Sequence, residues 1–113
     1  MSNVRTYDSE NKELNGTSES GYTVVDFYAD WCGPCQSFAP RFDKLAAGFN
    51  GKIDFVKVNV DAAPELAQKF GIRSIPTVVV LKGQQEVVRS VGAPRASDLE
   101  AYLYKLLEGT ATA

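Results

Sequence analysis

The stretch DFYADWCGPCQ, residues 26–36, holds both cysteines of a chain of 113 residues. It joins an apolar run to the dipeptide Gly33-Pro34, which predicts the start of a helix because proline is favoured in the first helical turn. Cys32 and Cys35 are three positions apart, so one helical turn brings their thiols to neighbouring positions where they can bond to each other. Three interpretations are open at this point: a metal clip, a structural staple or a reversible redox switch.

Composition separates these three interpretations. The chain has two cysteines and no histidine, whereas a zinc site needs four ligands, mostly Cys and His. Only a site shared between subunits would complete that set. Disulfide scaffolds are typical of small secreted proteins with many cysteines, and a bridge across three residues closes almost no loop. We therefore expect no metal, and a redox function is the leading interpretation.

Charge and hydropathy limit the partners. The formal net charge is −2, and no Lys/Arg cluster offers the electrostatic footprint needed to bind nucleic acid or an anionic membrane. No segment approaches the ~20 apolar residues that span a bilayer, and the N-terminus lacks the apolar core of a secretion signal. We expect a cytoplasmic monomer that meets proteins or small molecules. Neither repeats nor a linker divide the chain, so residues 1–113 are predicted to form a single domain.

Apolar patterns along the chain predict an α/β fold. Apolar runs indicate strands at 4–7, 22–29, 53–60, 77–82 and 86–91. Helical spacing predicts a helix from Gly33 to about residue 50, a short helix with Asp61 as its N-cap, and a last helix that begins with a Ser97/Glu100 capping box. A brief helix is expected in the polar segment 8–21. Strands that alternate with helices favour a parallel sheet covered on both faces, and the last two strands, around Gly83, add an antiparallel edge.

The predicted helix gives the two thiols different roles. Cys32 precedes the first turn, where unpaired backbone N–H groups and the helix dipole stabilise a thiolate, the nucleophile of disulfide exchange. Cys35 continues the apolar face of the helix and should be packed. We infer that Cys32 attacks a partner's disulfide and that Cys35 resolves the mixed disulfide. No polar donor stands between them, which favours a reductant over an oxidant. The alternative is an inert pair of buried cysteines.

Longer segments extend the motif. WCGPC at 31–35 is preceded by VVDFYAD at 24–30 and followed by KVNVD at 57–61 and FGIRSIPT at 70–77. In this order they resemble the thioredoxin family, from about Val24 to the last helix. The resemblance implies the thioredoxin fold, a mixed sheet of about five strands flanked by about four helices. It also implies a protein-disulfide reductase that binds no cofactor and is recharged by a thioredoxin reductase with electrons from NADPH.

A charged residue lies in the middle of each of the two apolar runs at 22–29 and 53–60. Asp26 has apolar neighbours on both sides, and burial without a full partner should raise its pKa toward neutrality. The resemblance makes Asp26 the group that takes the proton of Cys35 when that thiol resolves the mixed disulfide. Lys57 is the matching charge in the neighbouring strand. It either tunes this carboxylate or pairs with it in a structural role.

The resemblance also implies a shallow apolar surface for substrates. Trp31 would shield the thiol and offer a flat contact, and Ile75 would pair through its backbone with an extended substrate segment. The sequence alone favours a trans bond before Pro76, since only ~5–6% of X-Pro bonds are cis, but the resemblance implies a cis bond. The full predicted surface consists of Trp31, Gly33, Pro34, Ile75, Pro76 and Gly92.

Departures from the family pattern leave open which partner proteins the chain binds and what its reduction potential is. Tyr28 stands where a second tryptophan is common, Gln36 replaces a frequent lysine, Ser74 replaces a frequent glycine, and the turn at 82–86 is arranged unusually. Two other functions compete with the reductase. One is a binding module whose association depends on redox state or ignores it. The other is a disulfide oxidase or isomerase, which the Gly33-Pro34 pair disfavours.

Overall fold

The computed structural model describes residues 3–8, 14 and 18–109. Five strands form one mixed sheet in the order β1-β3-β2-β4-β5. They are β1 (Val4–Thr6), β2 (Tyr22–Tyr28), β3 (Asp54–Asn59), β4 (Thr77–Lys82) and β5 (Gln85–Val91). β1, β3 and β2 run parallel, whereas β4 is antiparallel to both β2 and β5. The predicted parallel strands with an antiparallel hairpin at the edge are confirmed.

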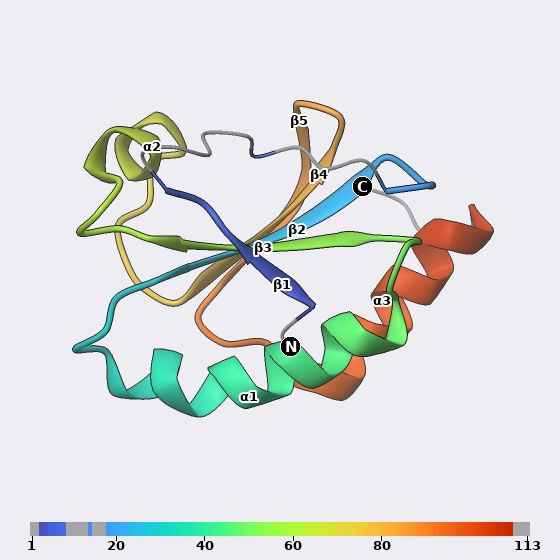
Figure 1. The fold of residues 1–113 in the computed structure, drawn as a ribbon, viewed down its shortest axis with the longest axis horizontal. Helices are drawn as coiled ribbons and strands as arrows, with labels where there is room; N and C mark the ends of the chain where they lie inside the picture. Colours follow the sequence, from blue (N-terminus) through green and yellow to red (C-terminus); the bar gives the residue numbers. More distant parts are fainter. Residues whose placement is uncertain (1–2, 9–13, 15–17, 110–113) are drawn as a thin grey trace.

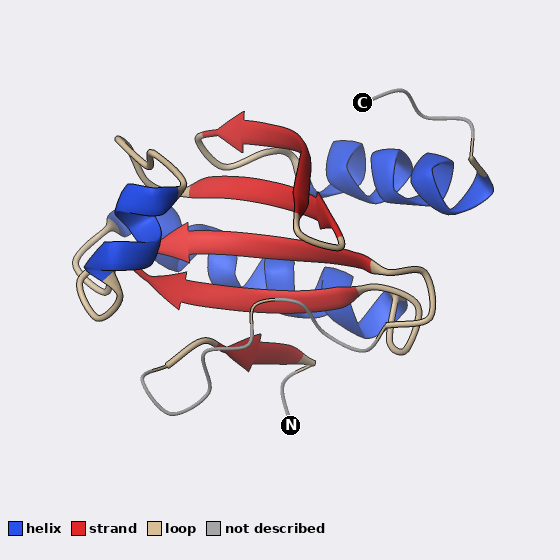
Figure 2. Cartoon of the chain, turned by 90° about the horizontal axis from the view of Figure 1, so that it is seen from above, coloured by secondary structure: helices blue, strands red, loops and turns tan. Residues whose placement is uncertain are grey.

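Helices cover both faces of the sheet. α1 (Gly33–Gly48) and α3 (Ala96–Glu108) lie on one face, and α2 (Pro64–Lys69) lies on the other (Figure 1; Figure 2). The described residues hold three helices rather than the four or so expected. The brief helix predicted within 8–21 falls mostly on 9–13 and 15–17, outside the described residues. None of the described helices is long and apolar enough to cross a membrane.

β2 lies inside the sheet and is buried on both faces. Its successive side chains therefore enter two different apolar cores. Side chains alternate along a strand. Val24 therefore packs with residues of α1 and α3 in one apolar core, while Val25 and Phe27 pack with α2 in the other. Asp26 shares the face of Val24, so its carboxyl lies on the side that α1 covers.

Two predicted helix starts are wrong. α2 begins at Pro64 without a side-chain cap, because proline fits the first turn and because the Asp61 carboxylate accepts a bond from Trp31 instead. α3 begins directly after Arg95, also without a side-chain cap. Ser97 therefore lies inside the first turn, where the carbonyl of Arg95 already accepts backbone N–H groups.

Candidate active site

The two cysteines lie where β2 leads into α1. Cys32 is the N-cap of α1, and Pro34 occupies the first turn. The Sγ of Cys32 accepts a hydrogen bond from the backbone N–H of Cys35 at 3.2 Å, and the two sulfurs form a disulfide across a Cα–Cα distance of 5.2 Å. The predicted position of Cys32 at the helix N-terminus is confirmed. In this oxidised form both residues are nearly buried, with 5% of Cys32 and 3% of Cys35 exposed.

The segment before β4 lies against the disulfide. The Sγ of Cys32 is 3.9 Å from the carbonyl oxygen of Ile75. The Ile75-Pro76 peptide bond is cis, as the resemblance implied. The N–H of Gly92 donates to the carbonyl of Pro76 at 2.8 Å. The structure thus brings three of the predicted surface residues, Ile75, Pro76 and Gly92, together beside the cysteines.

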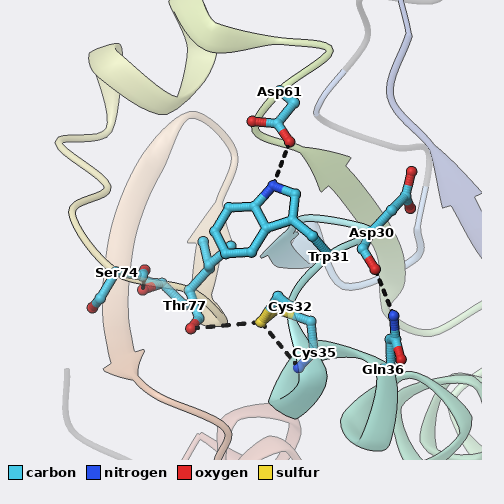
Figure 3. Close-up of a disulfide and its surroundings, with 9 residues drawn as sticks. Asp30, Trp31, Cys32, Cys35, Gln36, Asp61, Ser74 and Thr77 are labelled. Atoms are coloured by element: carbon cyan, nitrogen blue, oxygen red, sulfur yellow. Dashed lines mark hydrogen bonds between the residues drawn. A yellow bond between two sulfur atoms is a disulfide. The ribbon is translucent and has the colours of Figure 1, made fainter.

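Trp31 stands out from the surface next to Cys32 and is held by a carboxylate. The indole residue is 71% exposed, and its Nε1–H donates to Oδ2 of Asp61 at 2.7 Å (Figure 3). Asn59 holds the turn that carries Asp61, because its Oδ1 accepts the backbone N–H of Asp61 at 2.9 Å. Sequence reasoning missed both residues as parts of the site. The available signal was an Asn at the end of a strand and an Asp two residues later, residue types that bond to nearby backbone.

Gln36 braces the turn that carries Trp31 and Cys32. Its Nε2 donates to the carbonyl oxygen of Asp30 (Figure 3), and its backbone N–H donates to the carbonyl of Cys32 at 3.1 Å. These two bonds tie the turn to the beginning of α1. The side chain that ties this turn to α1 is thus a neutral amide. Gly33 and Pro34, both exposed, form the tip of the helix.

Asp26 is a nearly buried acid on the face of β2 that α1 covers. Only 4% of the residue is exposed, and its Oδ1 has no hydrogen-bond partner among the described residues. Burial raises the pKa of Asp26 from 3.8 to about 7, against a smaller lowering by the charge of Lys57. The carboxyl therefore gains and loses a proton near neutral pH, as its apolar surroundings in the sequence predict.

Lys57 is the strand neighbour of Asp26 but is not bonded to it. Their Cα atoms are in register across β2 and β3. Lys57 is exposed, and its Nζ lies 5.9 Å from the centre of the Tyr28 ring. No ion pair joins Lys57 to Asp26 within the part of the chain that the structure describes. The lysine thus acts on the carboxyl through its electrostatic field rather than through a direct bond.

Comparison with known proteins decides the family. The family model for thioredoxin matches residues 3–105. The chain belongs to the thioredoxin family. Thioredoxin 1 of Nostoc sp. is 49% identical over 84 residues, which cover 74% of this chain and 78% of that protein. The thioredoxin of Staphylococcus aureus is 45% identical over 95 residues, which cover 84% of this chain and 91% of that protein. The crystal structure of Malassezia sympodialis thioredoxin matches with a TM-score of 0.73 and 34% identity, covering 98% of this chain and 94% of that one.

Membership of the thioredoxin family settles the fold and the type of chemistry. The predicted thioredoxin fold, with a five-stranded mixed sheet, is confirmed. Thioredoxins are protein-disulfide oxidoreductases, and Cys32 and Cys35 give this chain the disulfide that this chemistry requires. The chain is therefore an enzyme that reduces protein disulfides by dithiol-disulfide exchange. Its substrates are proteins with disulfides, and a reductase partner returns it to the dithiol form.

Proposed function

We propose that Cys32 is the nucleophile and Cys35 the resolving thiol of this thioredoxin, and that a thioredoxin reductase recharges it with electrons from NADPH. The observation that carries the proposal is the hydrogen bond from the Cys35 N–H to the Cys32 Sγ at the N-terminus of α1. A sulfur that accepts such a bond at the positive end of a helix is stabilised as a thiolate. Cys35 is bonded to Cys32 and is buried in the core, which suits a thiol that reacts with Cys32 rather than with a substrate.

The exchange runs in two steps. The Cys32 thiolate attacks one sulfur of the substrate disulfide, the substrate S–S bond breaks, and the leaving sulfur takes up a proton. The Cys35 thiolate then attacks the Cys32 Sγ, which breaks the mixed disulfide and releases the second substrate sulfur, also to be protonated. Two electrons pass to the substrate. The enzyme ends with the Cys32–Cys35 disulfide, which is the form in this structure.

Asp26 is the proposed proton acceptor for Cys35. Cys35 attacks as a thiolate, so its proton must leave at a pH near neutrality. A carboxyl with a pKa of about 7 accepts and returns a proton at that pH, whereas an ordinary aspartate is already ionised and is a weak base. Lys57 is proposed to tune the carboxyl through its charge.

The proposed substrate surface surrounds Cys32. Trp31 offers a large exposed ring beside the sulfur, and the backbone of Ile75 approaches the same sulfur to 3.9 Å. An extended substrate segment that pairs with this backbone would place its own disulfide next to Cys32. The surface consists of Trp31, Gly33, Pro34, Ile75, Pro76 and Gly92.

We further propose that residues 1–113 form a single domain that works as a cytoplasmic monomer without a bound cofactor. Two apolar cores share one continuous sheet, which supports one folding unit. A dithiol reductant suits a compartment that keeps thiols reduced. Among the described residues, no three His, Cys, Asp or Glu side chains gather in a group that would hold a metal.

Reduction of insulin disulfides, followed as NADPH oxidation in the presence of a thioredoxin reductase, tests the proposal. The wild type should turn over, Cys32→Ser should lose turnover, and Cys35→Ser should stop at the mixed disulfide. An inactive wild type, or full turnover by Cys32→Ser, would contradict the proposed roles. Association with protein partners without their reduction would point instead to a binding module.

A further inference from the structure

Four side chains on one face of the sheet form a cluster beside the active site. The strand register pairs Asp26 with Lys57 and Tyr28 with Asn59, and residues two apart on a strand share a face. Within this cluster the Lys57 ammonium lies diagonally, with Nζ 5.9 Å from the centre of the Tyr28 ring. It makes no ion pair with Asp26 in the described part of the chain.

The Tyr28 ring is held in place for this contact. Tyr28 is half-buried and packs against the buried residues Ala29, Cys32 and Cys35, and its register partner on β3 is Asn59. Asn59 is itself fixed, because its Oδ1 accepts the backbone N–H of Asp61. An aromatic face within about 6 Å attracts an ammonium group. Lys57 therefore has two neighbours on β2, the Tyr28 ring and the Asp26 carboxyl, and its ammonium lies by the ring without an ion pair to Asp26 among the described residues.

We propose that Tyr28 is a positioning residue for the redox reaction: its ring holds the Lys57 ammonium away from the Asp26 carboxyl. The inference rests on the proton-acceptor role proposed for Asp26. The Tyr28 ring thereby becomes a determinant of how readily Asp26 takes a proton from Cys35.

Few other charges surround Asp26. β3 contributes Lys57, the residue opposite on β4 is the apolar Val78, and the buried residues of α1 include one titratable group, Cys35. An opposite charge within about 4–6 Å lowers the pKa of a carboxyl by about 1–3 units. An ammonium that moved onto Asp26 would thus keep the carboxylate ionised at neutral pH, where it could no longer accept the thiol proton.

The test is a carbon-13 NMR titration of the Asp26 carboxyl in Tyr28→Leu and Tyr28→Phe, in the reduced and oxidised proteins. Leucine removes the ring and frees Lys57 to approach, so the Asp26 pKa should fall by about 1 unit or more. Phenylalanine keeps the ring and loses only the hydroxyl, so it is the matched control and should leave the Asp26 pKa near the wild-type value. Adding Lys57→Met to each variant should abolish the difference between them.

Two results would overturn the positioning role. One is a Tyr28→Leu protein whose Asp26 pKa is unchanged or raised. The other is an Asp26 pKa that falls by the same amount when Tyr28→Leu is made in the Lys57→Met protein, which would show that the ring does not act through the lysine. The titration does not depend on turnover. If Asp26→Asn retained full activity at neutral pH, the proton-acceptor role would fail, while the titration would still report whether Tyr28 positions Lys57.

Discussion

Replacing Asp26 by leucine should stabilise the oxidised protein, and the gain should grow as the pH rises. Burial raises the pKa of Asp26 from 3.8 to about 7, so between these values the folded chain keeps a proton that the unfolded chain has released. Stability falls with rising pH wherever the folded state binds more protons. The contribution of Asp26 is thus fully present below the unfolded pKa and is lost as the pH rises through the folded pKa.

The size of the effect follows from the displaced pKa. A difference of about three pH units corresponds to about 4 kcal/mol, at about 1.36 kcal/mol per unit. Leucine has no proton to exchange, so its free energy of unfolding should exceed that of the wild type by a margin that grows by about this amount between acidic and mildly basic pH. The margin should level off above pH 7, where the carboxyl is ionised in both states.

Urea denaturation of the oxidised proteins, followed by circular dichroism from about pH 4 to about pH 8, gives the two stability curves. Lys57→Met is a useful companion, because it removes the charge that lowers the Asp26 pKa and should extend the loss of stability to higher pH. A margin between leucine variant and wild type that stayed constant with pH would refute the argument. A stability margin that shrank as the pH rose would show that the predicted direction of the pH dependence is wrong.

Three further predictions, with four variants, concern the rest of the site. Cys35→Ser should accumulate mixed disulfides with substrate proteins on non-reducing gels, while Cys32→Ser should form none; adducts through Cys35 alone would reverse the assigned roles. Asp61→Ala removes the partner of the Trp31 indole, which should cost about 1 kcal/mol of stability and raise KM for protein substrates more than it lowers kcat. An unchanged KM would mean that this bond does not serve substrate docking. Gly92 has a φ of +92° with open space for a Cβ, so Gly92→Ala should cost about 1–2 kcal/mol from the backbone alone, measured by urea unfolding; a protein as stable as the wild type would contradict this.

Most of the fold is predictable because β2 is buried on both faces. Such a strand is a near-continuous apolar run, so Asp26 stands out as the one charge within it. The Gly33-Pro34 pair places the start of α1, and with it the different settings of Cys32 and Cys35. These features follow from local patterns, and the structure confirms them.

Side-chain partners that come from different elements are harder to predict. Asp61, predicted to cap α2, instead accepts the N–H of an indole thirty positions away, and this tertiary contact outweighs a local cap. Lys57 likewise lies by the ring of Tyr28 rather than on its register partner Asp26. Both choices depend on side-chain conformations and on loops packed between strands, which no spacing pattern encodes.

The sulfur that caps α1 is also the proposed nucleophile, so in the proposed mechanism one set of backbone donors serves two anions in turn. In the disulfide form the Cys35 N–H donates to the Cys32 sulfur, and the same donor would stabilise the Cys32 thiolate in the reduced chain. Once Cys32 enters a mixed disulfide, its sulfur is neutral, and the positive end of the helix is available to Cys35 as that thiol becomes anionic. In this mechanism charge passes between neighbouring sulfurs at the same helix N-terminus. Use of the same backbone donors would keep the reorganisation energy of each two-electron transfer small, a useful property in a protein that must accept and donate electrons repeatedly.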